Sequence, residues 1–190
     1  MPAAAPTLAR KLPWNDRAGR FAPLKATVLV LLFLPVLHLL YRTLTGDLGA
    51  RPLTEAIHVL GDWTIYLLLF TLAITPARRL LDWPKLIQVR RMVGLAALFY
   101  IILHFGLYVV DSRLDLVFVA KEIVLRVYLL IGFVALLGLV ALGATSTDGM
   151  IKRLGAIRWN RLHRLIYVIT ALALLHYFMQ SKIDVTQPVL

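Results

Sequence analysis

Long apolar stretches separated by short polar connections run along most of the chain. Each stretch is close to the roughly 20 residues that a membrane-spanning helix needs. The five stretches cover residues 24–44, 53–75, 92–110, 123–142 and 162–179. Two shorter apolar pieces, 114–120 and 150–158, suit interfacial or loop segments better than spanning helices. The pattern predicts an all-α membrane bundle of five transmembrane helices.

Local signals refine three of these helices. The first stretch is too long for the core of a typical signal peptide, so we expect it to be retained. The second is expected to end at Pro76, because proline breaks helices and Arg78 and Arg79 follow as basic anchors. The fourth contains three glycines that permit close contact between helices, namely Gly132, Gly138 and Gly143.

The composition agrees with a single membrane domain. Hydrophobic residues make up 60% of the 190 residues and the mean hydropathy is +0.79, far above an ordinary soluble domain. We assign residues 24–185 to this domain, 1–23 to a disordered cytoplasmic tail and 186–190 to a periplasmic tail. Cysteine is absent, which excludes disulfides, thiolate-ligated haem, iron–sulfur clusters and cysteine-type zinc sites in this chain.

The basic residues predict the orientation in the membrane. The net charge is +11, and 15 of the 21 Lys and Arg residues fall within 10–25, 78–91 and 152–164. The remaining six lie in the alternate connections, together with most of the acidic residues. Because cytoplasmic loops carry an excess of Lys and Arg, we expect a cytoplasmic amino terminus and, after five spans, a periplasmic carboxyl terminus.

Two of the five histidines are expected at the same depth in the membrane. His104 lies 13 residues after Arg91, and His176 lies 12 residues after Arg164. Each is therefore roughly 18–20 Å from the cytoplasmic boundary, on helices that run in the same direction. Such a pair could approach one iron from opposite faces, as a bis-histidine b-type haem requires. The alternative is that each imidazole only hydrogen-bonds across helices.

His163 precedes His176 by 13 residues, near the cytoplasmic end of the same helix. It could ligate a second haem, but the corresponding position on the third helix is Arg90 or Arg91 rather than histidine. In an ideal helix the two imidazoles would also point well apart, so the start of the helix must deviate if both face the bundle. Interfacial anchoring and a contact with a haem propionate or a flavin have equal weight with ligation.

Other charged side chains have two interpretations each. His58 joins Glu55 and Asp62 on one polar face, which suits a solvated helix end slightly better than a quinone, proton-handling or propionate site. His38, after Pro35 on the first helix, is expected to serve packing. Basic residues near the cytoplasmic rim suit lipid anchors first and cofactor phosphates or propionates second: Arg78, Arg79, Arg90, Arg91, Arg161 and Arg164.

Four segments resemble one known family: ITPARRL, QVRRMVGLAALFYIILH, KEIVLRVYLLIG and ATSTDGMIKRLGAIRWNRLHRLIYVITALALLHY. They are similar to the ferric-reductase-like transmembrane family, and within it to the haem-binding membrane subunits of bacterial periplasmic methionine-sulfoxide reductase systems. The resemblance covers about residues 24–185. It implies that the metal ligands are His104, His163 and His176. This family commonly has a sixth helix, whereas five are predicted from the sequence in hand.

The resemblance also implies cofactors and partners. Haem b and FMN are the implied cofactors, with contacts expected from the three histidines and from Arg78, Arg79, Arg91 and Arg164. Electrons would come from the quinone pool or a cytosolic flavin reductase and pass to a periplasmic molybdopterin (MsrP-like) reductase subunit, which carries out methionine sulfoxide repair. The alternatives are a ferric reductase or quinol-oxidising cytochrome b and, in another class, a small proton-coupled transporter.

Overall fold

The computed structural model describes residues 12–15 and 19–186, and side chains up to Ser181. Most of the predicted tails, at 1–11, 16–18 and 187–190, therefore lies outside the described residues. The described elements are helical, in the order α1 Pro23–Thr45, α2 Pro52–Leu80, the 3-10 helix η1 Pro84–Gln88, α3 Arg90–Asp111, α4 Leu116–Leu125, α5 Val127–Ala144, α6 Asp148–Leu154, α7 Ala156–His163 and α8 Leu165–Thr186.

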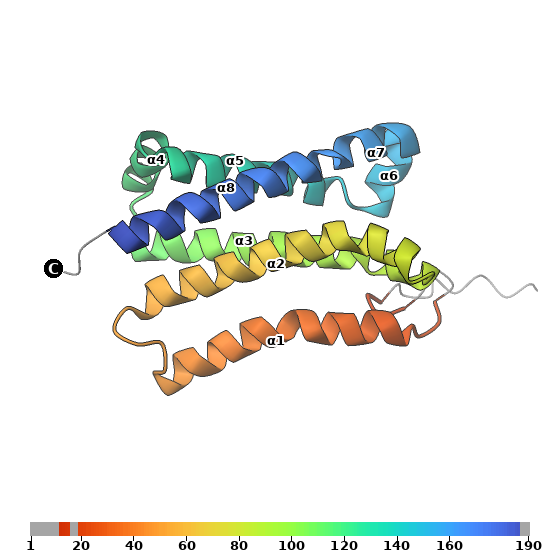
Figure 1. Ribbon diagram of the computed structural model, residues 1–190, viewed down its shortest axis with the longest axis horizontal. Helices are drawn as coiled ribbons and strands as arrows, with labels where there is room; N and C mark the ends of the chain where they lie inside the picture. Colours follow the sequence, from red (N-terminus) through yellow and green to blue (C-terminus); the bar gives the residue numbers. More distant parts are fainter. Residues whose placement is uncertain (1–11, 16–18, 187–190) are drawn as a thin grey trace, which may run out of the picture.

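The predicted all-α architecture is confirmed. Five helices among the described residues are long and apolar enough to cross a membrane. They are α1, α2, α3, α5 and the continuous stretch Ala156–Ser181, which joins α7 to α8. The start of α1 and the end of α8 lie at opposite ends of the bundle (Figure 1).

Four of these helices form a closed ring. α2 packs against α3, α3 against α5, α5 against α8, and α8 against α2. Successive members of the ring run in opposite directions, so α3 and α8 are parallel and lie across the bundle from each other (Figure 1). α1 packs outside the ring against α2 and α3. Residues on α3 and α8 that point inward therefore meet at the centre.

The prediction that the second helix ends at Pro76 is wrong. α2 continues through Pro76 to Leu80, so Arg78 and Arg79 form its last turn. Proline removes one backbone N–H and hence one helical hydrogen bond, which neighbouring helices and local adjustments compensate in membrane bundles. α2 packs against both α3 and η1, and this packing supports the helix.

The fourth predicted helix is divided in the structure. Residues 116–125 form the separate helix α4, which takes in most of the predicted interfacial piece, and α5 begins only at Val127. The break is Arg126, whose backbone is extended at φ −107° and ψ 107°. Its side chain forms an ion pair with Glu122 at 2.6 Å, and the Asp115 side chain caps the start of α4 by accepting from Phe118 N–H. Apolar residues flank Arg126 on both sides, at 123–125 and 127–130, so hydropathy averaged over a window did not locate the break.

A buried tyrosine attaches the outer helix to the ring. Tyr100 on α3 is 1% exposed, and its hydroxyl donates to the Leu32 carbonyl of α1 at 2.7 Å. A hydroxyl in this apolar surrounding needs a partner, and the carbonyl supplies it. Tyr100 therefore contributes both packing and a polar contact between α1 and α3.

Removing this hydroxyl tests the attachment. We expect Tyr100→Phe to lower the free energy of unfolding by about 0.5–1.5 kcal/mol, the usual contribution of an interhelical hydrogen bond in a membrane protein. Denaturation of the purified protein in detergent measures the change. Tyr41→Phe is the matched control, because Tyr41 is 64% exposed on α1. Equal stability of the two variants would show that the Tyr100 hydrogen bond contributes nothing.

Candidate functional site

His104 lies in the middle of α3 with its ring directed toward α2. Its Nδ1 is 2.8 Å from the Ile57 carbonyl oxygen. A carbonyl oxygen can only accept, so Nδ1 carries the hydrogen in this contact. The neutral ring then has its lone pair on Nε2, the nitrogen available to a metal.

His176 on α8 has the same environment on the opposite side of the bundle. Its Nδ1 is 2.7 Å from the Tyr128 carbonyl oxygen of α5. The ring also lies nearly parallel to the Tyr128 ring, with centroids 6.1 Å apart and planes at 21°. The hydrogen bond therefore leaves Nε2 of His176, like that of His104, with its lone pair.

The two imidazoles meet at the centre of the ring of helices. Their centroids are 6.5 Å apart and their planes are nearly perpendicular, at 87°. Two metal–nitrogen bonds of about 2 Å, plus about 1 Å from each nitrogen to its ring centre, would separate imidazoles on opposite sides of one metal by roughly 6 Å. The observed separation thus fits two ligands that share one metal.

The donor set favours haem iron over a bare metal ion. Among the described residues, no three His, Asp or Glu side chains are placed to hold a metal. Two imidazoles are a sparse set for a free ion, but they are enough where a porphyrin supplies the remaining nitrogens. The pair predicted from depth alone therefore lies together in the fold, while its role as iron ligands stays a prediction.

His163 is not part of this pair. It ends α7, where its ring stacks on the Trp159 indole with centroids 3.9 Å apart. Its Nε2 is 3.2 Å from the Thr145 hydroxyl, and Trp159 Nε1 donates to the Thr145 carbonyl at 2.9 Å. α7 ends at His163 and α8 begins at Leu165, with Arg164 between them in the right-handed helical region. Ligation by His163 stays a prediction, and His163 belongs to no group of three possible metal ligands among the described side chains.

The predicted basic residues lie at one end of the bundle and differ in exposure. Arg78 is partly buried and Arg79 exposed in the last turn of α2, while Arg164 is exposed between α7 and α8. Arg91, at the start of α3, forms an ion pair with Asp148 at the start of α6. Arg91 therefore joins two elements, which gives it a structural role beside any contact with a cofactor.

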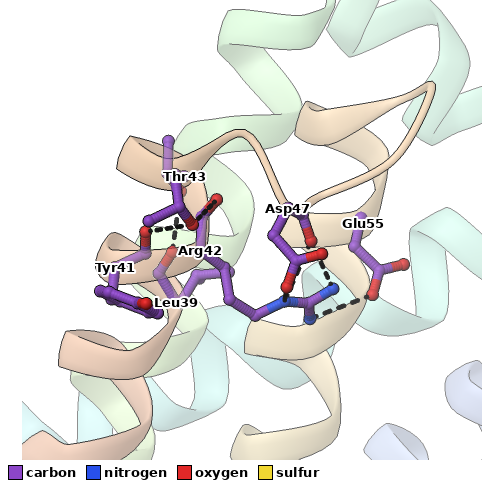
Figure 2. Close-up of polar contacts among 7 residues, drawn as sticks. Leu39, Tyr41, Arg42, Thr43, Asp47 and Glu55 are labelled. Atoms are coloured by element: carbon purple, nitrogen blue, oxygen red, sulfur yellow. Dashed lines mark hydrogen bonds and ion pairs between the residues drawn. The ribbon is translucent and has the colours of Figure 1, made fainter.

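The polar residues of α2 lie at the other end. Arg42 donates to the Asp47 carbonyl at 2.9 Å and lies 3.6 Å from the Glu55 carboxylate, as Figure 2 shows. This contact ties the end of α1 to the start of α2 and supports the solvated-end interpretation of Glu55. Asp62 lies within electrostatic range of His58 and Glu55, as expected for one helix face. His38 is exposed on α1.

The sequence did not reveal the groups that orient the two imidazoles. The acceptors are backbone carbonyls, those of Ile57 and Tyr128, and every residue has a carbonyl. Only the rotation of α2 and α5 decides which carbonyl faces the histidine. The sole signal in the sequence is a glycine four residues after each acceptor, at Gly61 and Gly132.

Comparisons with known proteins agree on one family. The model of the ferric reductase like transmembrane component matches residues 60–174. This segment includes His104 and ends two residues before His176. No solved structure shows a significant match to the chain.

Curated relatives cover most of the chain. A protein of Herminiimonas arsenicoxydans is 45% identical over 88% of this chain and 78% of its own length. One from Rhodospirillum rubrum is 43% identical over 93% of this chain and 83% of its own. One from Deinococcus radiodurans is 41% identical over 83% and 78%. Each is named as the haem-binding subunit MsrQ of a protein-methionine-sulfoxide reductase.

The chain is a multi-pass membrane protein of the ferric-reductase-like transmembrane family. Within that family it belongs to the MsrQ group.

Proposed function

We propose that the chain is the haem b-containing electron-transfer subunit of a methionine-sulfoxide reductase system in the bacterial inner membrane. The supporting observation is the pair of imidazoles 6.5 Å apart, each with Nδ1 on a backbone carbonyl. The names of the relatives supply haem and methionine sulfoxide as the chemical context. Substrate chemistry would then belong to the partner subunit.

The residues of the chain would hold and orient the cofactor. Nε2 of His104 and of His176 would ligate the iron, while the Ile57 and Tyr128 carbonyls keep each ring in one tautomer and orientation. When bound, haem supplies reversible one-electron transfer, and its axial ligands and surroundings set its potential. The apolar helices around the pair would limit the access of water to the centre.

The ligand assignment predicts how histidine variants behave. His104→Ala and His176→Ala should each lose most of the haem or shift it to a high-spin spectrum, because one protein ligand remains. His163→Ala should have a separable effect that leaves this centre intact. Reduced-minus-oxidised absorbance spectra and haem per protein measure both outcomes.

His38→Ala provides the control, since His38 is exposed on α1. A complete low-spin spectrum in His104→Ala, with haem lost from His38→Ala or His58→Ala, would contradict the pairing. A wild-type protein that takes up no haem would overturn the proposed function and favour the proton-coupled transporter.

The partners follow from an orientation with the basic end in the cytoplasm. At this end, electrons would arrive from the quinone pool or from a cytosolic flavin reductase. At the opposite end, they would pass to a periplasmic molybdopterin reductase subunit of the MsrP-like class. The orientation of the bundle would thus decide on which side of the membrane each reaction takes place.

Bound FMN would lie near the basic end. Cations and polar contacts are available there from Arg78 and Arg79 in the last turn of α2, from Arg164 between α7 and α8, and from His163. A phosphate group prefers such guanidinium groups. Arg91 is engaged by Asp148, so we assign it a weaker contribution.

Charge reversal tests this flavin site. We expect Arg78→Glu with Arg79→Glu to lower FMN content several-fold while haem remains largely intact, because the paired histidines lie elsewhere. Flavin fluorescence after denaturation and the haem spectrum of the same sample measure the two contents. Arg42→Glu, at the opposite end of α2, is the control for a general charge effect. Unchanged flavin in the double variant would move the site elsewhere.

The orientation is tested independently. We expect a reporter fused before residue 1 to be active in the cytoplasm and one fused after residue 190 to be active in the periplasm. The support is the 15-to-6 distribution of basic residues, with the start of α1 and the end of α8 at opposite ends of the bundle. A cytoplasmic carboxyl terminus would exclude five spans for this chain.

A further inference from the structure

Each central histidine packs against a glycine of the helix that accepts its hydrogen bond. His104 donates to the Ile57 carbonyl, and Gly61 follows four residues later on α2. A Cβ added at Gly61 would lie 3.2 Å from Nδ1 and 3.3 Å from Cε1 of His104. The His104 ring therefore occupies the space that a side chain at position 61 would take.

The same arrangement recurs on the other side of the bundle. His176 donates to the Tyr128 carbonyl, and Gly132 follows four residues later on α5. A Cβ at Gly132 would lie 2.8 Å from Nδ1 and 3.0 Å from Cγ of His176. Two helix pairs thus present the same motif, an acceptor carbonyl with glycine one turn later.

Helix geometry explains why the glycine stands at this spacing. Side chains on a helix lean toward its amino terminus, so a residue covers the surface of the turn before it. A side chain at position 61 or 132 would therefore cover the carbonyl that the histidine uses. Glycine in a helix interior costs about 0.5–1 kcal/mol relative to alanine, so it needs a compensating role. Glycine at these positions leaves the carbonyl one turn earlier accessible to the histidine, and this is the compensating role.

We propose that Gly61 and Gly132 are positioning residues that, with the carbonyls of Ile57 and Tyr128, set the position and tautomer of the two axial imidazoles. The inference rests on the proposed haem-binding function. It adds that the state of the iron depends on two residues that contribute no side chain. The two positions differ in degree, because the space at Gly132 is tighter than that at Gly61.

The test compares two glycines of α5. Gly132→Ala places its methyl group against His176, whereas Gly138→Ala places one equally close, at 2.8 Å, to Ile169 of α8. Both variants crowd the same pair of helices, but only the first displaces an imidazole. The measurements are haem per protein, the low-spin electron paramagnetic resonance signal and the midpoint potential in a spectroelectrochemical titration.

We expect Gly132→Ala to lose most of its low-spin signal and to shift the midpoint potential of any haem it retains. Gly138→Ala should keep the wild-type signal and potential, even if it unfolds at a lower temperature. Equal spectra and potentials in the two variants would overturn the proposal, because the glycines would then serve packing alone. Absence of haem from the wild-type protein would overturn the proposed function and the inference together.

A second comparison remains decisive if Gly132→Ala does not fold. Gly61→Ala crowds His104 less severely, at 3.2 Å, and should keep its haem while shifting the low-spin signal and the potential. Its control is Gly106→Ala on α3, two residues after His104, where an added Cβ meets nothing within 4 Å. A Gly61→Ala protein with the spectrum and potential of Gly106→Ala would also overturn the proposal.

Discussion

The centre of the bundle depends on two hydrogen bonds from imidazole Nδ1 to backbone carbonyls, at His104 and His176. In an apolar interior an N–H group without a partner costs several kcal/mol, so these contacts hold each ring firmly. A helical carbonyl already accepts one bond from its own helix, and its second lone pair serves the histidine. The contact therefore leaves the acceptor helix intact while it fixes the direction in which Nε2 points.

The connectivity of the chain supplies the rest of this geometry. Short connections place sequential helices side by side and antiparallel, so α3 and α8 become parallel helices on opposite corners of the ring. The corners between them belong to α2 and α5, and these helices supply the two carbonyls. Each half of the bundle thus contributes one histidine and one acceptor. Two helix pairs, α2 with α3 and α5 with α8, form equivalent half-sites that become one site only when they pack together.

Hydropathy and the basic residues were enough to predict five helices and the common depth of His104 and His176. They could not predict how each helix is rotated, because lipid is as apolar as the bundle interior and both faces of a spanning helix are hydrophobic. The acceptor carbonyls and Gly61 were missed for that reason. The predicted helix ends were also wrong in two places. Pro76 was expected to end α2 but lies within it, whereas Arg126, a single charge between two apolar segments, separates α4 from α5.

The two histidines of the α7–α8 stretch, His163 and His176, have different surroundings. In the outer half of α8, His176 faces another imidazole across the bundle and keeps Nε2 for a ligand. Just before the start of α8, His163 stacks on Trp159 and uses Nε2 toward the Thr145 hydroxyl. A metal bound through Nε2 of His163 would have to displace the Thr145 hydroxyl. The inner imidazole is therefore held by side chains of Trp159 and Thr145 and not by a backbone carbonyl, which distinguishes it from the central pair.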